Sequence, residues 1–176
     1  MKVSIIGQGY VGLTISMGAL SAEHEVIGVD LSEKIVNSLK LGKSHIEGIN
    51  DVDIAKGIKN RTYNPTSDYS LISDSDVVVI AVPTPLDDFG KPDLVMLESA
   101  AKSVGGALKK RALIINESTS FPGTLRDVIS PLVEKFSPLG HLYAISPERV
   151  DPGNKSFGTK NTPRIVGGIK IGRAHV

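Results

Sequence analysis

Continuous apolar runs alternate along this chain with segments whose apolar residues recur at helical spacing. The continuous runs are short and rich in β-branched residues, as in strands buried on both faces, and they cover residues 3–6, 26–29, 76–82, 112–115 and 142–145. Helical spacing predicts helices over 11–20, from Ser32 to Gly42, over 93–108 and after Pro122. We also expect a short edge strand at 61–64 and a short helix at 67–72, whereas the polar stretch 42–57 predicts no defined element.

This alternation of strands and helices predicts the fold class. Strands separated by helices pair in parallel through right-handed crossovers, so we expect an α/β fold with a doubly wound parallel sheet. With 176 residues, 40% of them hydrophobic, the chain is long enough to bury one substantial core. It therefore corresponds to a single domain, with no internal repeat and no flexible linker.

The charge balance and the apolar runs exclude several classes of partner. Lys and Arg number 20 against 19 Asp and Glu, a net charge of +1 that gives no general attraction to nucleic acid or anionic lipid. No apolar run approaches the ~20 residues that span a bilayer, and the chain enters a strand pattern directly, without the features of a signal peptide. We expect a cytoplasmic protein with no nucleic-acid and no membrane partner.

Two residue types limit the chemistry that this chain can supply. Cysteine is absent, so there are no disulfides, thiolate metal ligands or thiol nucleophiles. The four histidines do not have the spacing of metal ligands, and we expect no metal site at His24, His45, His141 or His175.

A glycine-rich loop directly after the first apolar run is the strongest functional signal. Gly7, Gly9 and Gly12 form a G-x-G-x-x-G pattern between a predicted strand and a predicted helix, and Asp30 closes the next apolar run. Such glycines let the backbone approach a pyrophosphate at a helix N-terminus, and the acid accepts hydrogen bonds from a ribose. The alternative is a merely structural glycine turn. The full arrangement favours a Rossmann-type dinucleotide site, and the Asp30 carboxylate favours NAD over NADP because it would repel a 2′-phosphate.

Polar and proline-rich segments follow three later strands of the predicted sheet, at residues 82–85, 117–124 and 146–154. Ligands of doubly wound sheets bind beyond the carboxyl ends of the strands. We therefore expect these segments to converge with the glycine loop on one edge of the sheet.

The same three segments carry a family resemblance. Val-Pro-Thr-Pro at 82–85, Glu-Ser-Thr with Pro-Gly-Thr within 117–124, and Ser-Pro-Glu-Arg-Val at 146–150 resemble the N-terminal domain of the UDP-glucose/GDP-mannose dehydrogenase family. Within it, Glu-Arg-Val and Ser-His-Ile at 44–46 are more similar to the branch that oxidises UDP-N-acetylhexosamines. The resemblance covers residues 1 to about 170. It implies NAD-dependent oxidation of C6 of a UDP-sugar to the carboxylate, for polysaccharide or glycan synthesis.

The resemblance also implies roles around the cofactor. It places Tyr10, Val11, Asp30, Thr84 and Thr119 around NAD, with the glycines under the pyrophosphate. Thr119 matches a position used for cofactor or catalytic-water contacts. The alternative for Thr119 is an N-cap of the following helix.

The segment after the last predicted strand would supply the substrate side of the site. Glu148 matches a glutamate that performs acid/base work in hydrolysing an acyl-enzyme; the alternative is a surface ion pair with Arg149. Arg149 and Val150 match positions that contact the sugar nucleotide. Glucose-type relatives carry a second acid where this chain has Pro152, which supports the N-acetylhexosamine branch.

Members of this family also need a cysteine nucleophile, a lysine and an asparagine that lie outside the resemblance. We therefore expect residues 1–170 to be the NAD-binding domain of a C-terminally truncated enzyme, homodimeric at full length, and residues 171–176 to be a non-native tail. Two alternatives remain open. One is a stand-alone NAD-binding module without catalysis, and the other is a small β-hydroxyacid dehydrogenase, which would not explain Ser-Pro-Glu-Arg-Val.

Overall fold

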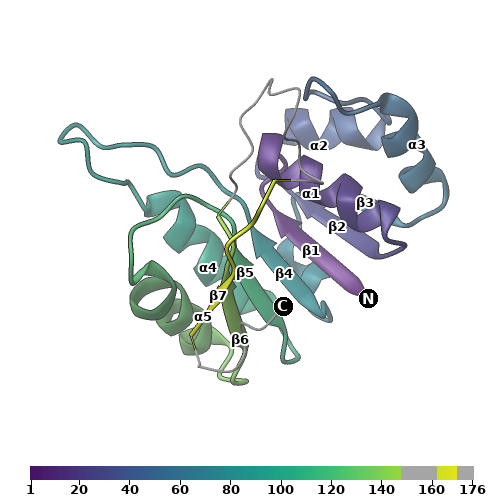
Figure 1. Ribbon diagram of the computed structural model, residues 1–176. Helices are drawn as coiled ribbons and strands as arrows, with labels where there is room; N and C mark the ends of the chain where they lie inside the picture. Colours follow the sequence, from purple (N-terminus) through teal and green to yellow (C-terminus); the bar gives the residue numbers. More distant parts are fainter. Residues whose placement is uncertain (148–161, 170–176) are drawn as a thin grey trace.

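The computed structural model describes residues 1–147 and 162–169, which form one mostly parallel seven-stranded sheet flanked by helices (Figure 1). The strands are β1 Lys2–Ile6, β2 Glu25–Val29, β3 Tyr63–Thr66, β4 Val77–Ile80, β5 Leu113–Asn116, β6 Leu142–Ile145 and β7 Gly167–Gly168. The α-helices are α1 Tyr10–Ser21, α2 Glu33–Lys40, α3 Asp51–Lys59, α4 Val95–Ala107 and α5 Ser130–Phe136. A 3-10 turn, η1 Tyr69–Ile72, and a π-helical turn, η2 Leu125–Ile129, complete the described elements.

The strand order places a reversal of the chain path at the centre of the sheet. The order is β3-β2-β1-β4-β5-β6-β7, so the chain builds outward from β1 to β3 and then returns to start again at β4. β1 pairs in parallel with both β2 and β4, with Ile5 opposite Gly28 on one side and Val79 on the other. Connections leave β1 and β4 in opposite directions, which opens a crevice at their carboxyl ends.

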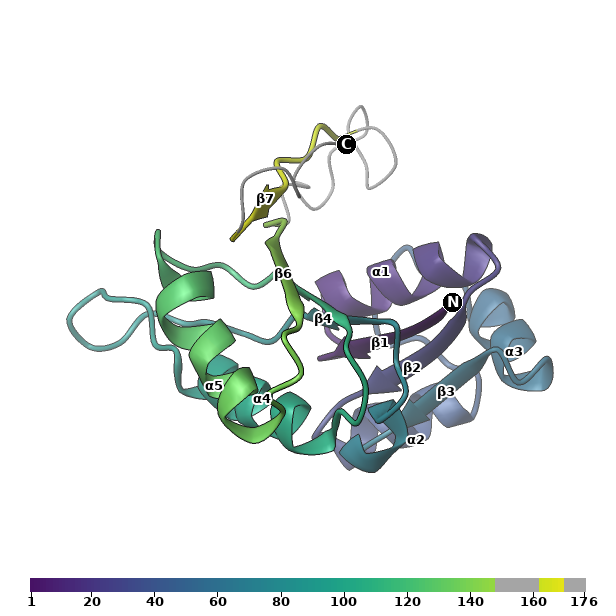
Figure 2. The same cartoon turned by 90° about the horizontal axis from the view of Figure 1, so that it is seen from below.

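The central strand β1 buries alternate side chains in opposite layers. Ile5 of β1 packs with Leu13, Leu39 and Ile54 of α1, α2 and α3, whereas the adjacent Ile6 belongs to the cluster formed by α4, η2 and α5. Figure 2 shows α1 on one side of the sheet and α4 and α5 on the other. Helices therefore bury both faces of the central strands, which explains the continuous apolar sequences of these strands.

The structure confirms the α/β doubly wound prediction and corrects it in three places. The stretch 42–57, predicted to hold no element, contains the start of α3, whose acidic first turn and basic last turn are favourable for a helix. The edge strand predicted at 61–64 lies at Tyr63–Thr66. β7 was not predicted, and it pairs antiparallel to β6 at the edge of the otherwise parallel sheet.

The remaining predicted elements are present with boundaries shifted by a few residues. The helix expected at 67–72 is the short turn η1, and the helix after Pro122 is the π-helical turn η2 continuing into α5. Within 1–147 and 162–169, no helix is long and apolar enough to cross a membrane.

Candidate functional site

A large cavity lies at the strand-order reversal. Its volume is about 1010 Å3, and it is lined by the glycine loop, the end of β2, the loops after β4 and β5 and the first turns of α4. Seven of the eight residues predicted to bind the cofactor line it: Gly7, Gly9, Tyr10, Val11, Asp30, Thr84 and Thr119. Gly12, which lies in α1, does not. The glycine loop and the segments at 82–85 and 117–124 therefore meet at one edge, as predicted, together with the end of β2, whereas most of the predicted segment 146–154 lies outside the described residues.

Close backbone approach explains why the loop needs its first and third glycines. Gly7 has a φ of +90°, and a Cβ there would lie 2.5 Å from the carbonyl oxygen of Ala81. A Cβ on Gly12 would lie 1.8 Å from the carbonyl oxygen of Gly7. No side chain other than hydrogen fits at either position without moving backbone.

The second glycine is different, because it faces open space. Apart from its chain neighbours, no atom of the described residues lies within 4 Å of a Cβ built on Gly9, which is the N-cap of α1 and lines the cavity. No side chain caps the first turn of α1, and that turn carries no acid. The loop is thus a cradle that a Cβ would partly fill, in front of helix N–H groups that favour an anion.

Asp30 is held rigidly at the end of β2. Its Oδ2 accepts a hydrogen bond from the backbone N–H of Gln8 at 2.8 Å, and its Oδ1 accepts one from Ser32 at the same distance. Each carboxylate oxygen keeps a further lone pair for a ribose hydroxyl. Nearby, burial and the charge of Asp30 raise the pKa of Tyr69 to about 12, so this cavity-lining phenol stays neutral.

Two buried polar residues, Asn116 and Ser118, position the loop after β5, a role that the sequence does not predict for either. Ser118 Oγ accepts from the backbone N–H of Val82 at 3.0 Å, which ties the loop after β5 to the loop after β4. Asn116 Nδ2 donates to the carbonyl of Ser118, and its Oδ1 accepts from the Ser118 N–H. Their position at a strand end was the available signal, since polar residues there need partners.

Thr119 is exposed at the cavity wall and does not cap the following helix. The helical turn begins only after Thr124, whose hydroxyl donates instead to the carbonyl of Phe121 at 2.8 Å. The N-cap alternative is therefore wrong, and Thr119 lines the cavity instead.

Glu117, whose role the sequence left open, is paired. Its carboxylate accepts hydrogen bonds from Arg164 Nη1 at 3.1 and 3.0 Å, and its side chain is only 7% exposed. Arg164 precedes β7, so the pair fastens that segment to the cavity wall.

Other predicted site residues fall outside what the structure describes. Glu148, Arg149 and Val150 lie in the gap between 147 and 162, and residues 171–176 lie beyond 169. Their predicted roles, including the Glu148–Arg149 alternative, stay predictions. In the described ranges no group of three or more His, Cys, Asp or Glu residues could hold a metal ion.

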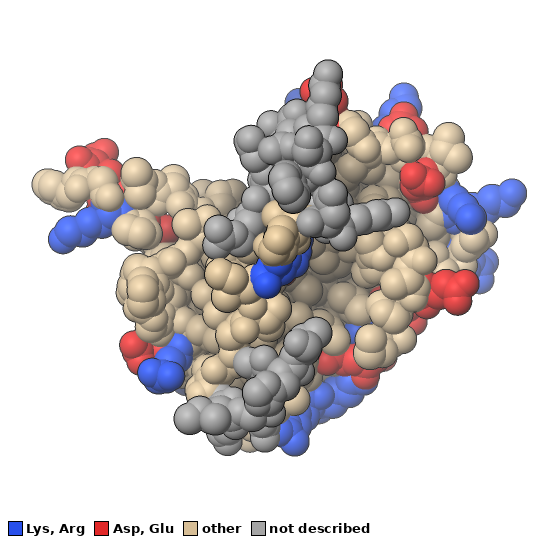
Figure 3. Space-filling model, viewed as in Figure 1, with Lys and Arg blue, Asp and Glu red and all other residues tan. Residues whose placement is uncertain are grey.

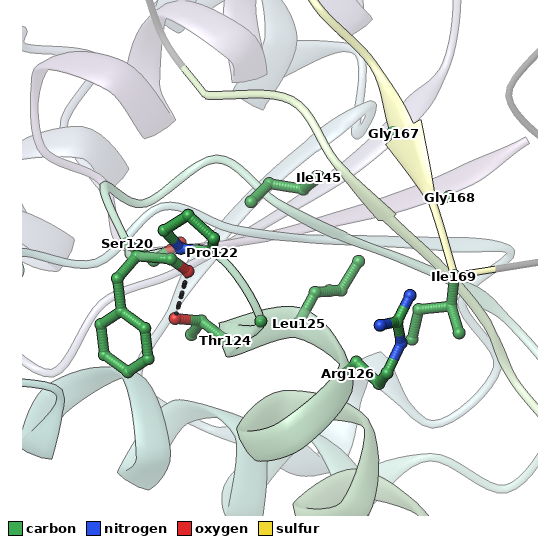
Figure 4. Close-up of a pocket in the computed structure, with 11 residues that line it drawn as sticks. Ser120, Pro122, Thr124, Leu125, Arg126, Ile145, Gly167, Gly168 and Ile169 are labelled. Atoms are coloured by element: carbon green, nitrogen blue, oxygen red, sulfur yellow. Dashed lines mark hydrogen bonds between the residues drawn. The ribbon is translucent and has the colours of Figure 1, made fainter.

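A smaller cavity of about 330 Å3 lies between the start of η2 and strands β6 and β7 (Figure 4). Its lining includes Arg126, Ile145 and Ile169, and none of the predicted site residues. Charged side chains on the face of Figure 3 are scattered in both signs, without a single large patch.

Comparison with known proteins agrees with this geometry. A family model described as the NAD-binding domain of the UDP-glucose/GDP-mannose dehydrogenase family matches residues 1–174. The chain is 33% identical over 171 residues to Protein CapL of Staphylococcus aureus, and 31% identical over 172 residues to UDP-N-acetyl-D-glucosamine 6-dehydrogenase of Pseudomonas aeruginosa. These alignments cover 95% and 96% of this chain, but only 39% and 40% of the two relatives.

A solved structure gives the same result for the fold. The chain superposes on the UDP-D-ManNAc dehydrogenase of Pyrococcus horikoshii with a TM-score of 0.87 and 30% identity. The match covers 96% of this chain and 41% of that one. The chain thus spans about 40% of the length of the proteins that it matches.

Proposed function

Because the chain belongs to the UDP-glucose/GDP-mannose dehydrogenase family, as a match to that family's NAD-binding domain over residues 1–174 shows, we propose that it is the cofactor-binding part of an NAD-dependent UDP-sugar 6-dehydrogenase. One observation carries the proposal. The cavity of about 1010 Å3 lies at the strand-order reversal and has the glycine cradle on one wall and the fixed Asp30 carboxylate on another.

The residues present fit a dinucleotide. Gly7, Gly9 and Gly12 would let the pyrophosphate approach the first-turn N–H groups of α1, and Asp30 would accept from the ribose hydroxyls. When bound, NAD supplies a hydride acceptor. Thr84 and Thr119, from the loops after β4 and β5, would present hydroxyls to the cofactor from the opposite wall.

We further propose that the substrate is a UDP-N-acetylhexosamine. The support is the Ser-Pro-Glu-Arg-Val segment, together with the substrates named for the Pseudomonas and Pyrococcus relatives. Arg149 and Val150 would contact the sugar nucleotide, and Glu148 would act as an acid or base in hydrolysis. A chain without cysteine cannot supply a thiol nucleophile, so this proposal assigns it cofactor and substrate binding. The homodimer, the cytoplasmic location and a non-native tail at 171–176 remain part of the same proposal.

The cofactor proposal is tested by titrating the chain with NAD and NADP in a calorimeter. We expect NAD to bind more tightly than NADP. Asp30→Asn should weaken NAD binding about tenfold or more, because a hydrogen bond to a charged group is lost. The control is Asp74→Asn, an exposed carboxylate whose side chain is paired with Lys2 away from the cavity. Equal affinity for NAD and NADP, or equal effects of the two variants, would contradict the proposal.

The substrate proposal is tested by saturation-transfer NMR with UDP-N-acetylglucosamine, UDP-N-acetylmannosamine and UDP-glucose in the presence of NAD. We expect stronger transfer to an N-acetylated sugar nucleotide than to UDP-glucose, and loss of that signal in Arg149→Ala. A preference for UDP-glucose would assign the chain to the other branch of the family.

A further inference from the structure

Gln8 lies between the first two glycines of the loop, which both line the cavity, but Gln8 itself does not line it. Its side chain is completely buried. Its backbone N–H donates to Asp30 Oδ2, and its carbonyl accepts a hydrogen bond from His45 Nε2, both at 2.8 Å. The main chain of this one residue therefore connects the glycine loop to the ribose-binding acid and to the loop that precedes α3.

The side-chain amide of Gln8 also makes hydrogen bonds, two through its nitrogen and two through its oxygen. Nε2 donates to the carbonyl oxygens of Ile5 and Gly7, each at 3.1 Å. Oε1 accepts from Tyr63 Oη at 2.7 Å and from Ser16 Oγ at 3.1 Å. The amide thus joins β1, the glycine loop, α1 and β3 at one buried point.

The neighbouring residues are fitted to this amide. A Cβ on Gly28 would lie 2.7 Å from Gln8 Oε1 and 2.9 Å from the Tyr63 ring, so the glycine in β2 keeps the space that the amide and phenol occupy. Burial, opposed by the hydrogen bond with Ser16 and reinforced by the charge of Asp30, raises the pKa of Tyr63. The phenol therefore remains a donor to Gln8.

We propose that Gln8 is a positioning residue for NAD binding, whose buried amide locks the glycine loop in the conformation that receives the pyrophosphate. The inference rests on the proposed NAD site. A loop with three glycines has a large conformational entropy, and ordering it on binding would weaken affinity. Four side-chain hydrogen bonds to Gln8 supply that order before the ligand arrives.

The test compares three variants by NAD titration and by chemical denaturation. Gln8→Met keeps the length of the side chain and removes its hydrogen bonds, and Tyr63→Phe removes one donor while keeping the ring. The control is Ser4→Ala. It removes the buried hydrogen bond between Ser75 and Ser4 of β1, the strand that precedes the loop, and leaves the loop itself unchanged. We expect the NAD dissociation constant to rise about tenfold for Gln8→Met, about threefold for Tyr63→Phe and less than about twofold for Ser4→Ala.

Amide hydrogen exchange of the unliganded chain separates this inference from the proposed function. Exchange at residues 7–12 should be about tenfold faster in Gln8→Met than in the unaltered chain, and unchanged in Ser4→Ala. If Gln8→Met binds NAD as tightly as the unaltered chain, or if loop exchange does not change, Gln8 is only a structural residue. If the loop exchanges as expected but the unaltered chain binds no NAD, the proposed function fails and the NAD role of Gln8 fails with it.

Discussion

Gly12 and Gly9 of the glycine loop are required for different reasons, fold stability for Gly12 and space for the cofactor for Gly9. Substitution by alanine should therefore affect different properties at the two positions. In Gly12→Ala the new methyl would lie 1.8 Å from the carbonyl oxygen of Gly7, so we expect a loss of about 3 kcal/mol in the free energy of unfolding. Gly9 has a φ of −69°, which alanine adopts freely, and apart from its chain neighbours the methyl would meet no atom of the described residues. Gly9→Ala should therefore keep the stability of the protein while weakening NAD binding at least about tenfold, because the methyl enters the cavity.

Urea denaturation and NAD titration of the same samples check both expectations. Gly18→Ala is the matched control, since Gly18 lies within α1, is exposed and has open space around its Cβ position. Alanine there should stabilise the helix by about 0.5–1 kcal/mol and leave NAD affinity unchanged. A Gly9→Ala protein that binds NAD normally would show that the pyrophosphate does not approach this loop.

At the scale of elements, an ion pair joins Arg164, in the segment before β7, to Glu117 in the wall of the cavity. Glu117 is nearly buried, so removing its partner leaves a carboxylate with less of the hydrogen bonding that offsets its burial. We expect Arg164→Ala to lower the free energy of unfolding by about 2 kcal/mol. Guanidinium denaturation followed by circular dichroism measures this loss.

The comparison for that prediction is an ion pair that lies on the surface. Lys102 and Glu98 are four residues apart on α4, 3.7 Å from each other and both roughly half-exposed. Lys102→Ala should change stability by no more than about 0.5 kcal/mol. Equal effects of Lys102→Ala and Arg164→Ala would mean that the Glu117 pair contributes no more than a surface contact.

The sequence predicts the elements that are decided locally. Strands buried on both faces are visible as continuous apolar runs, and the glycine loop and Asp30 are visible because the turn and the strand end require those residue types. α3 was missed because it buries only Ile54 and Gly57, which leaves little apolar periodicity. β7 is two glycines long, and a strand of that length has no pattern of its own.

The parts of the site that escaped prediction depend on contacts between distant segments. Tyr63 donates to Gln8 across 55 positions of the sequence, and Arg164 reaches Glu117 across 47. Local patterns cannot specify such pairs, because many polar residues could serve as partners. The sequence therefore indicated what the cavity binds, whereas the structure was needed to find what holds its walls in place.

At the scale of the whole molecule, one buried histidine fastens the far edge of the sheet. His141 Nδ1 accepts from the backbone N–H of Ala112 at 3.1 Å, just before β5, and Nε2 lies 3.1 Å from Ser137 Oγ at the end of α5. Ser137 Oγ donates to the carbonyl of Leu108, so the imidazole Nε2–H donates to Ser137. This network holds the neutral imidazole, since protonation would put a second N–H against the Ala112 donor.

The stability of the molecule should therefore depend on pH through His141. Burial, partly opposed by the charge of Glu134 and further aided by Arg111, lowers the pKa of His141 below its ordinary value of 6.5. Above 6.5 the folded and unfolded chains both carry a neutral imidazole, and the stability contribution is complete. As the pH falls below 6.5 the unfolded chain takes up a proton that the folded chain resists, so the free energy of unfolding decreases until the folded-state pKa is reached.

Urea denaturation at intervals from pH 7.5 to 5 measures this decrease, above the range in which most carboxylates titrate. In His141→Asn the amide oxygen can accept from Ala112 but does not titrate. We expect this variant to be less stable than the unaltered chain at pH 7.5 and to lose less stability as the pH falls to 5. An identical slope in the two proteins would show that other groups cause the acid sensitivity, and that His141 serves the sheet edge by packing alone.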